Sequence, residues 1–329
     1  MKSPFTGGGV IRQVNQEELE FRNEKFIISY NNYRCVDTGT EFTNKEIDEL
    51  NMHLLHSAYR DKHNIPFPEE IKSIRKKYDV SQTKMSAILG FGANTYRNYE
   101  NGDIPLLANA KLISLASKPQ GFIDLVMECD ALSQNQKQKC IKSVKKIDSD
   151  TRTLNNWMFN NQEPSELTGY KSPSLDKINA MIVFFALNAY VFKVKMNKLL
   201  FYADFIHFKN HGYSISGASY QAIQMGPVPH RYGTLFEVGA DTGAFSIELV
   251  QFDEREGERF VSAPKNNILN ILSEEEKSTL VFIKESLGAV KTSELIKYSH
   301  EEEAWLANKD EQSIIDYNYA FKLKHPADV

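Results

Sequence analysis

The sequence predicts an α+β protein of several domains: a small β-rich N-terminal domain, an all-α domain and a mixed, mainly α C-terminal domain. Its 329 residues, of which 41% are hydrophobic and 25% charged, suffice for more than one hydrophobic core. Prolines interrupt the helical pattern at residues 64–68, and residues 147–174 are rich in Asn, Ser and Pro. These breaks predict domains at 1–64 and 65–147, a linker at 148–174 and a last domain at 175–329.

Composition indicates a reduced, cytoplasmic protein. The N-terminus lacks the apolar core of a signal peptide, and the longest apolar run, residues 181–192, is too short to span a bilayer. Three scattered cysteines do not make a disulfide framework. We therefore expect no membrane partner.

Residues 1–64 are expected to form short strands followed by one helix. The segments GGVIRQV, LEFRNEKFIISY and YRCVDTGTEF alternate loosely between apolar and polar residues, as half-buried strands do. Asn44 can cap a helix that continues through KEIDELNMHLLHSAYR.

Residues 65–147 carry the pattern of a helix-turn-helix domain. Pro68 opens one helix, Ser81 can cap the next, and Gly90 ends it. After a tight turn, NTYRNYEN predicts a short third helix with Tyr96 and Tyr99 inward, and a fourth starts at Pro105. In such domains the third helix lies in the major groove of DNA.

The outward face of that third helix carries side chains suited to reading base edges. We expect Asn94, Thr95, Arg97 and Asn98 there, because Asn can pair with adenine and Arg with guanine or a phosphate. Phosphate contacts are expected from the basic residues Lys72, Arg75, Lys76, Lys77 and Lys84.

Charge supports this interpretation. Residues 66–147 hold 13 Lys and Arg against 8 Asp and Glu, whereas the whole chain has a formal net charge of −4. A basic segment within an acidic chain suits a nucleic-acid-binding module joined to parts with other partners. A solvated helical bundle that binds nothing is the alternative.

The segment IRKKYDVSQTKMSAILGFGANTYRNYENG resembles the Xre-type helix-turn-helix of the MqsA antitoxin family. The family's Asn at the start of the recognition helix falls on Asn94. Its second base-reading residue, an Arg, falls on Asn98, and an Arg stands one place earlier at Arg97. The resemblance implies DNA binding without predicting which sequence is read.

In that family a small domain with two C-x-x-C zinc pairs precedes the helix-turn-helix. The matching positions here are Ser3 and Thr6, then Cys35 and Thr38, so one thiol stands where four are expected. Because hydroxyls do not replace thiolates as structural zinc ligands, we expect a degenerate zinc-ribbon fold with no metal or other cofactor.

The C-terminal domain is expected to begin with two helices within residues 177–211. A glycine-containing, Pro-stiffened loop at 212–229 follows, then a hairpin from FSIELVQF and RFVSA. A helix capped by Ser273 and Glu276 ends at Gly288, and TSELIKYSHEEEAWL predicts another short amphipathic helix.

Three motifs of this domain, NKLLFYADFIHF, SISGASYQAIQMGPVP and SHEEEAW, resemble the Panacea (SocA-like) antitoxin family over residues 175–320. The resemblance implies a domain that neutralises a partner toxin, and in the SocA case delivers it to a protease. The matched positions, either toxin contacts or scaffold, are Lys198, Tyr202, Asp204, Tyr220, Gly226, Pro227 and Pro229.

An enzyme is the weaker interpretation. Asp204, His207 and His211 have helical spacing that could point all three at one metal ion. No glycine-rich phosphate loop, G-x-S-x-G or H-E-x-x-H occurs, so we expect no catalytic residue and no metal site.

The sequence thus predicts a type II toxin–antitoxin system antitoxin and transcription repressor. It would bind a cognate protein toxin through the C-terminal domain and double-stranded operator DNA as a homodimer. The alternatives are a transcription regulator whose C-terminal domain senses a ligand or protein, and a proteolytic adaptor for the toxin. The toxin, the operator, the stoichiometry and the role of residues 1–64 are left open.

Overall fold

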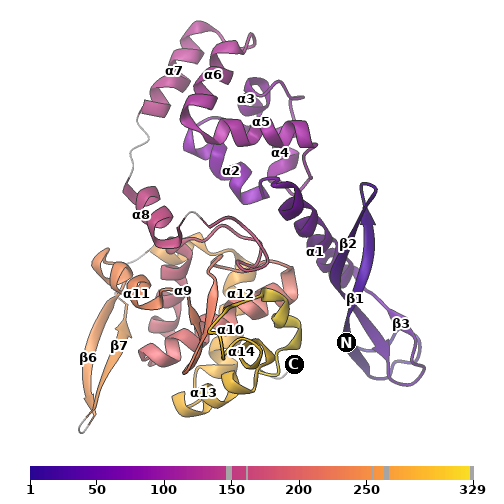
Figure 1. Cartoon of the computed structure of the whole chain (residues 1–329), viewed down its shortest axis with the longest axis vertical. Helices are drawn as coiled ribbons and strands as arrows, with labels where there is room; N and C mark the ends of the chain where they lie inside the picture. Colours follow the sequence, from indigo (N-terminus) through magenta and orange to yellow (C-terminus); the bar gives the residue numbers. More distant parts are fainter. Residues whose placement is uncertain (146–149, 161, 253–254, 263–266, 327–329) are drawn as a thin grey trace. The chain divides into compact units, whose positions relative to one another are not determined.

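A computed structural model describes residues 1–145, 150–160, 162–252, 255–262 and 267–326 (Figure 1). It forms two compact units, one of residues 1–17, 29–53 and 155–329, the other of residues 18–28 and 54–154. The predicted α+β class is confirmed. The bounds of the four predicted segments stay a prediction.

The N-terminal residues form a three-stranded sheet and one helix. Strand β2 lies between β1 and β3, and Tyr33 of β2 pairs with Phe42 of β3. Asn44 accepts a hydrogen bond from the Ile47 amide, which confirms the predicted cap. The elements are β1 (Val10–Phe21), β2 (Glu24–Cys35), β3 (Glu41–Phe42) and α1 (Lys45–His63).

The next segment is entirely helical, as predicted. Ser81 accepts a hydrogen bond from the Lys84 amide and so caps α3, and Gly90 follows that helix with a positive φ of 70°. The helices are α2 (Pro68–Lys77), α3 (Gln82–Ile88), α4 (Thr95–Glu100), α5 (Leu107–Ser117), α6 (Pro119–Glu128) and α7 (Gln134–Lys145).

One core holds these helices together. Tyr78 stacks on Phe122 with 3.8 Å between ring centroids, and both side chains are fully buried. The Tyr96 hydroxyl donates to the Ile71 carbonyl at 2.6 Å, and Ser86 accepts from the Tyr96 amide. These two bonds tie the short helix α4 to α2 and α3.

The remaining elements surround α10. The first are α8 (Asp150–Phe159), α9 (Leu175–Asn188), α10 (Lys193–His211), β4 (Tyr220–Ile223), β5 (Gly226–Pro229), α11 (Tyr232–Asp241), β6 (Ser246–Phe252) and β7 (Arg255–Val261). The last are η1 (Asn267–Ile271), α12 (Glu274–Leu287), α13 (Thr292–Glu301), α14 (Glu303–Leu306), β8 (Ile314–Ile315) and η2 (Tyr317–Lys322).

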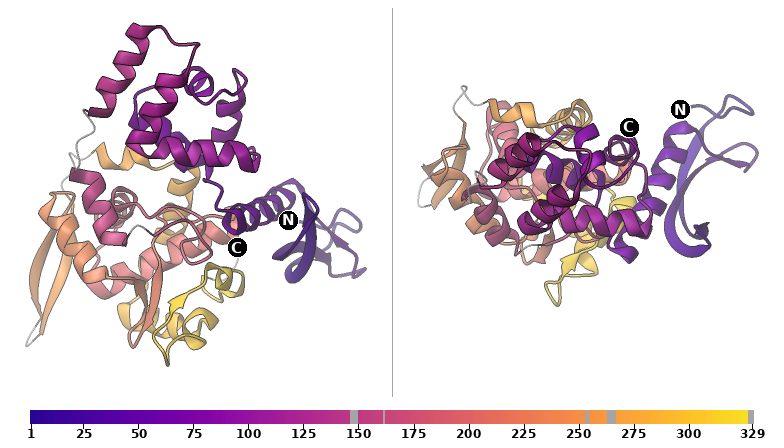
Figure 2. Two further views of the ribbon diagram at one scale, coloured as in Figure 1. Left: turned by 45° about the horizontal axis from the view of Figure 1, so that its top comes forward. Right: turned by 90° about the horizontal axis from the view of Figure 1, so that it is seen from above.

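Helix α10 is buried on every face from Lys195 to Lys209. It contacts α9, α12, α13, β5 and η2, which enclose it. The small sheet has the strand order β5-β4-β8. The predicted hairpin forms as β6 and β7, drawn in orange, which extend away from the helices in Figures 1 and 2.

Two segments differ from the prediction. The expected linker contains α8. Within it the Asn155 side chain donates a hydrogen bond to the Pro173 carbonyl and accepts one from the Leu175 amide, so α8 is attached to the start of α9. The helix expected through SHEEEAW is interrupted at Glu302, whose backbone is extended. Its buried carboxylate accepts hydrogen bonds from the Lys324 and His325 amides.

The apolar run 181–192 lies largely in α9, where Met181, Ile182, Val183 and Phe185 are buried, but Leu187 and Tyr190 near its end are exposed. Among the described helices, none combines the length and the apolar character needed to cross a membrane.

The loop after α10 folds back closely on residues 172–173. Gly217 has a φ of +72°, and a Cβ there would lie 2.6 Å from the Ser172 carbonyl oxygen. Gly243, at the end of α11, has a similar φ of +75° but no atom within 4 Å of the Cβ position.

We expect Gly217→Ala to lower the free energy of unfolding by about 2–4 kcal/mol, because it adds a backbone clash to left-handed strain. Gly243→Ala, which adds the strain alone, should lower it by about 1 kcal/mol. Chemical denaturation of the full chain measures both. Equal losses would show that Gly217 is needed only for its backbone conformation.

Candidate functional site

Helix α4 presents the face predicted to read DNA. Asn94, Arg97 and Asn98 are exposed and Thr95 is half-buried, whereas Tyr96 and Tyr99 are buried on the opposite side. The two tyrosines anchor the helix through the Ile71 carbonyl and Asn109. This arrangement leaves the polar side chains on a rigid, accessible surface.

The basic residues expected to contact phosphate fall into two groups. Arg75 forms an ion pair with Glu100 of α4 and donates to the Val80 carbonyl, and Lys77 donates to the Ser117 carbonyl. Lys72 and Lys76 are exposed, and Lys84 is half-buried. The first group therefore holds helices together, and phosphate contact by the second stays a prediction.

The Arg75–Glu100 pair is largely shielded from water. Its side chains are 16% and 3% exposed, and Gln82 also donates to the Glu100 carboxylate. Burial opposes ionisation of Glu100, but the hydrogen bonds from Arg75 and Gln82 outweigh it and lower the pKa of this carboxyl. The pair joins α2 to α4.

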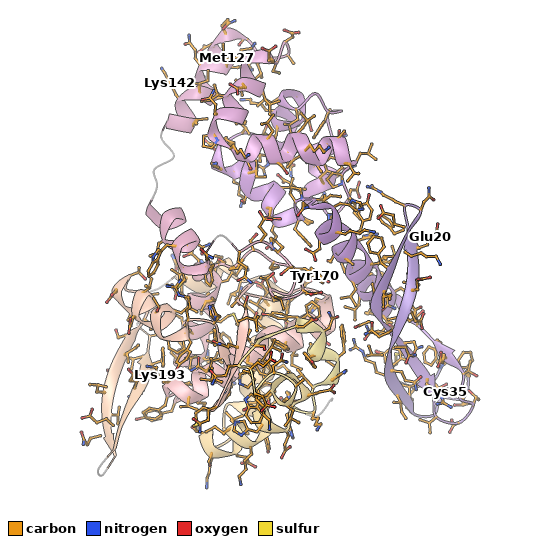
Figure 3. The ribbon with its side chains drawn as sticks, in the orientation of Figure 1. Glu20, Cys35, Met127, Lys142, Tyr170 and Lys193 are labelled. Carbon is orange, nitrogen blue, oxygen red and sulfur yellow. The ribbon has the colours of Figure 1, made fainter. Side chains whose placement is uncertain are left out.

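The four positions that match zinc ligands lie close together at the end of the N-terminal sheet where Figure 3 labels Cys35. The Ser3 hydroxyl donates to the Cys35 sulfur at 3.0 Å, and the Thr6 hydroxyl lies 3.6 Å from it. Hydrogen bonding from Ser3 and Thr38 lowers the pKa of the buried Cys35 thiol, while burial acts in the opposite direction.

These residues do not fit zinc. A structural zinc ion takes four thiolate or imidazole ligands, but this cluster offers one sulfur and three aliphatic hydroxyls, which do not ionise near neutral pH. Among the described residues no group of three or more His, Cys, Asp or Glu side chains is placed to hold a metal ion.

All seven motif positions of the C-terminal domain are buried. Asp204 accepts hydrogen bonds from the Ile215 and Ser216 amides, the Ser216 hydroxyl and the Tyr220 hydroxyl. Burial raises the pKa of Asp204. The Tyr202 hydroxyl donates to Glu302. Toxin binding by these side chains stays a prediction, and their geometry favours the scaffold alternative.

Strand β5, which is the segment GPVP, and the turn before it are held from α10. Lys198 Nζ donates to the Pro227 carbonyl at 3.0 Å, and burial lowers the pKa of Lys198 to about 7. Gly226 has a φ of +92°, and a Cβ there would lie 2.4 Å from the Ser299 hydroxyl and 2.5 Å from Lys198 Nζ. Only glycine fits this contact.

The exposed residues near this turn were not among the predicted positions. Gln224 and Met225 are exposed, and Met225 keeps 46% of its surface. Trp305 donates its indole N–H to the Ile223 carbonyl and stacks on His300. Lys309 lies over the Trp305 ring. We call Gln224, Met225, Trp305 and Lys309 the turn patch. Its sequence signal, Met within QMGPVP, is weak because one exposed Met is ordinary.

The three residues with metal-like spacing on α10 do not converge. Asp204 faces the 215–220 loop, whereas His207 Nδ1 lies 2.9 Å from the Thr279 hydroxyl. The His207 ring lies beside the His211 ring at a tilt of 35°. Thr279 donates its own proton to the Glu275 carbonyl, so His207 must donate through Nδ1. The arrangement is that of a neutral core histidine.

Comparison with known families agrees with this geometry. Residues 1–126 match the model of the MqsA antitoxin component of bacterial toxin–antitoxin systems, and residues 196–306 match the SocA-like antitoxin Panacea domain. The chain joins two antitoxin-family segments. A search of curated proteins found no match. The MqsA-like segment contains the Cys35 cluster and α4, and the Panacea match contains all seven buried motif positions.

The neutral state of His207 leads us to expect that the Panacea domain loses stability in acid. Burial, and then the nearby His211, lower the pKa of His207 to about 2. The unfolded chain takes up a proton below about pH 6.5 and the folded one does not, so stability falls as the pH falls through this range.

We expect the free energy of unfolding to be about 2 kcal/mol lower at pH 5 than at pH 7 from this residue alone. Denaturant titration of the full chain at both values measures it. The non-titrating variant His207→Gln should show a smaller pH dependence. An unchanged pH dependence in that variant would contradict the assignment.

Proposed function

We propose that this protein is the antitoxin of a type II toxin–antitoxin system, which binds its cognate toxin through the Panacea domain and represses its own operon through the helix-turn-helix. The observation that carries the proposal is the exposed polar face of α4 within a chain whose two matched segments are both antitoxin families. The proposed site of action is the cytoplasm, and the proposed DNA-binding form is a homodimer on a two-fold operator.

Charge supports two separate partners. Residues 66–147 carry five more basic than acidic side chains, and the chain as a whole has a net charge of −4. A basic helical segment favours the phosphate backbone, and an acidic remainder favours a basic protein toxin through steering and charge complementarity.

Within the proposed DNA interface, Arg97 and Arg75 have different roles. Arg97→Ala should weaken binding to duplex DNA from upstream of this gene by about tenfold or more without changing thermal stability, because it removes an exposed contact. Arg75→Ala should instead lower the unfolding free energy by about 2 kcal/mol or more, since Glu100 loses its partner.

Fluorescence anisotropy at one fixed salt concentration and thermal unfolding measure the two effects. Lys297→Ala, an exposed substitution in α13, is the control. If Arg97→Ala binds the operator like the unmodified protein, base reading by α4 is wrong.

For the toxin interface we propose the turn patch. The Trp305 indole N–H bonds the Ile223 carbonyl, and the buried Lys198 bonds the Pro227 carbonyl, so Met225 and Trp305 are presented with little conformational freedom to lose on binding. Aromatic and Met side chains on a rigid support are typical of interface centres. The seven buried positions would then determine the shape of this surface.

Met225→Asp should abolish rescue of growth when the toxin from the adjacent gene is co-expressed, because it places a charge in the contact. Leu249→Asp on β6, where the side chain is 71% exposed, should leave rescue intact. The reverse result would assign toxin binding to the β6–β7 hairpin. Absence of rescue by the unmodified protein would favour a transcription regulator with a sensing domain.

A proteolytic adaptor is the second candidate function, implied by the SocA-like match. It predicts that the toxin's half-life in cells shortens when this protein is present, whereas simple masking by the Panacea domain leaves the half-life unchanged or longer.

A further inference from the structure

Two tight turns meet at the end of the N-terminal sheet. In the first, the Ser3 amide donates to the Gly8 carbonyl and the Gly7 amide donates to the Ser3 carbonyl. In the second, the Cys35 amide donates to the Thr40 carbonyl and the Gly39 amide donates to the Cys35 carbonyl. A backbone bond from the Val36 amide to the Gly9 carbonyl links them.

The side chains between the turns form a chain of hydrogen bonds centred on Cys35. Ser3 donates to the sulfur, and Thr6 donates to the Asp37 carboxylate. The oxygen of Thr6, whose proton is used in this way, lies 3.6 Å from the Cys35 sulfur. The sulfur is fully buried, so water does not compete for the bond that Ser3 donates to it.

We propose that this hydrogen-bonded thiol replaces a metal ion: Cys35 and its surrounding hydroxyls hold the two turns together, and the N-terminal domain folds without zinc. The MqsA match implies a metal at these four positions, but their donor atoms do not suit one. The disagreement is resolved if hydrogen bonds to Cys35 connect the two turns here, in place of the bonds from cysteines to a zinc ion.

The spacing has remained close to that of a tetrahedral site. With zinc–sulfur bonds of about 2.3 Å, the sulfurs of a tetrahedral centre lie about 3.8 Å apart. Here the oxygens of Ser3 and Thr6 lie 3.0 and 3.6 Å from the Cys35 sulfur. Cysteines at positions 3, 6 and 38 would therefore surround one point together with Cys35.

The test uses the full chain and zinc chloride. The unmodified protein, expressed with zinc in the medium, should contain less than about one tenth of an equivalent of zinc. Hydrogen exchange at the amides of residues 3–9 and 35–40 should be unchanged by EDTA. Cys35→Ala should speed exchange there by about tenfold, and Cys35→Ser, which keeps an acceptor, should have a smaller effect.

The variant Ser3→Cys/Thr6→Cys/Thr38→Cys should bind one zinc ion per chain and lose this binding when Cys35→Ser is added. Unchanged exchange in α10 would report that the rest of the chain is folded. One equivalent of zinc in the unmodified protein, or faster exchange after EDTA, would overturn the proposal even if the triple variant does not fold. A folded triple variant without zinc would overturn the inferred spacing.

Discussion

The structure of the Panacea domain depends on satisfying the polar side chains of a fully buried helix. Helix α10 carries Asp204, Lys198 and Tyr202 into the core, where an unpaired charge or hydroxyl would cost several kcal/mol. Two backbone amides and two hydroxyls from residues 215–220 donate hydrogen bonds to Asp204, and the Pro227 carbonyl accepts one from Lys198. The chain after α10 must therefore fold back over the helix, and this requirement places the turn patch.

The same constraint separates structural from accessible side chains in the MqsA-like segment. Arg75 of α2 and Glu100 of α4 form an ion pair, so their charges fix the orientation of α4 relative to α2. Arg97, three residues before Glu100, is exposed. An inward ion pair thus holds the helix whose outward face we propose to read DNA, and the two roles can be separated by substitution.

Local signals in the sequence predicted most of the elements. The caps at Asn44, Ser81 and Ser273, the outward face of α4 and the β6–β7 hairpin are all determined by residues within a few positions of each other. The break at Glu302 was not predictable, because its cause is the pair of amides at Lys324 and His325. Nor was the inward direction of Arg75, since an Arg on an amphipathic helix can face either way until its partner is known.

The burial of the Panacea motif residues bears on how such a domain could serve different partners. We expect substitutions of Asp204 or Gly226 to disturb the turn, because Asp204 accepts from backbone amides of the following loop and a Cβ at Gly226 would meet Ser299 and Lys198. Exposed neighbours such as Gln224 and Met225 are free of that constraint, as their side chains contribute little to the core. If the turn patch binds the toxin as we propose, its exposed side chains can change to suit a partner while the buried residues keep the fold that supports them.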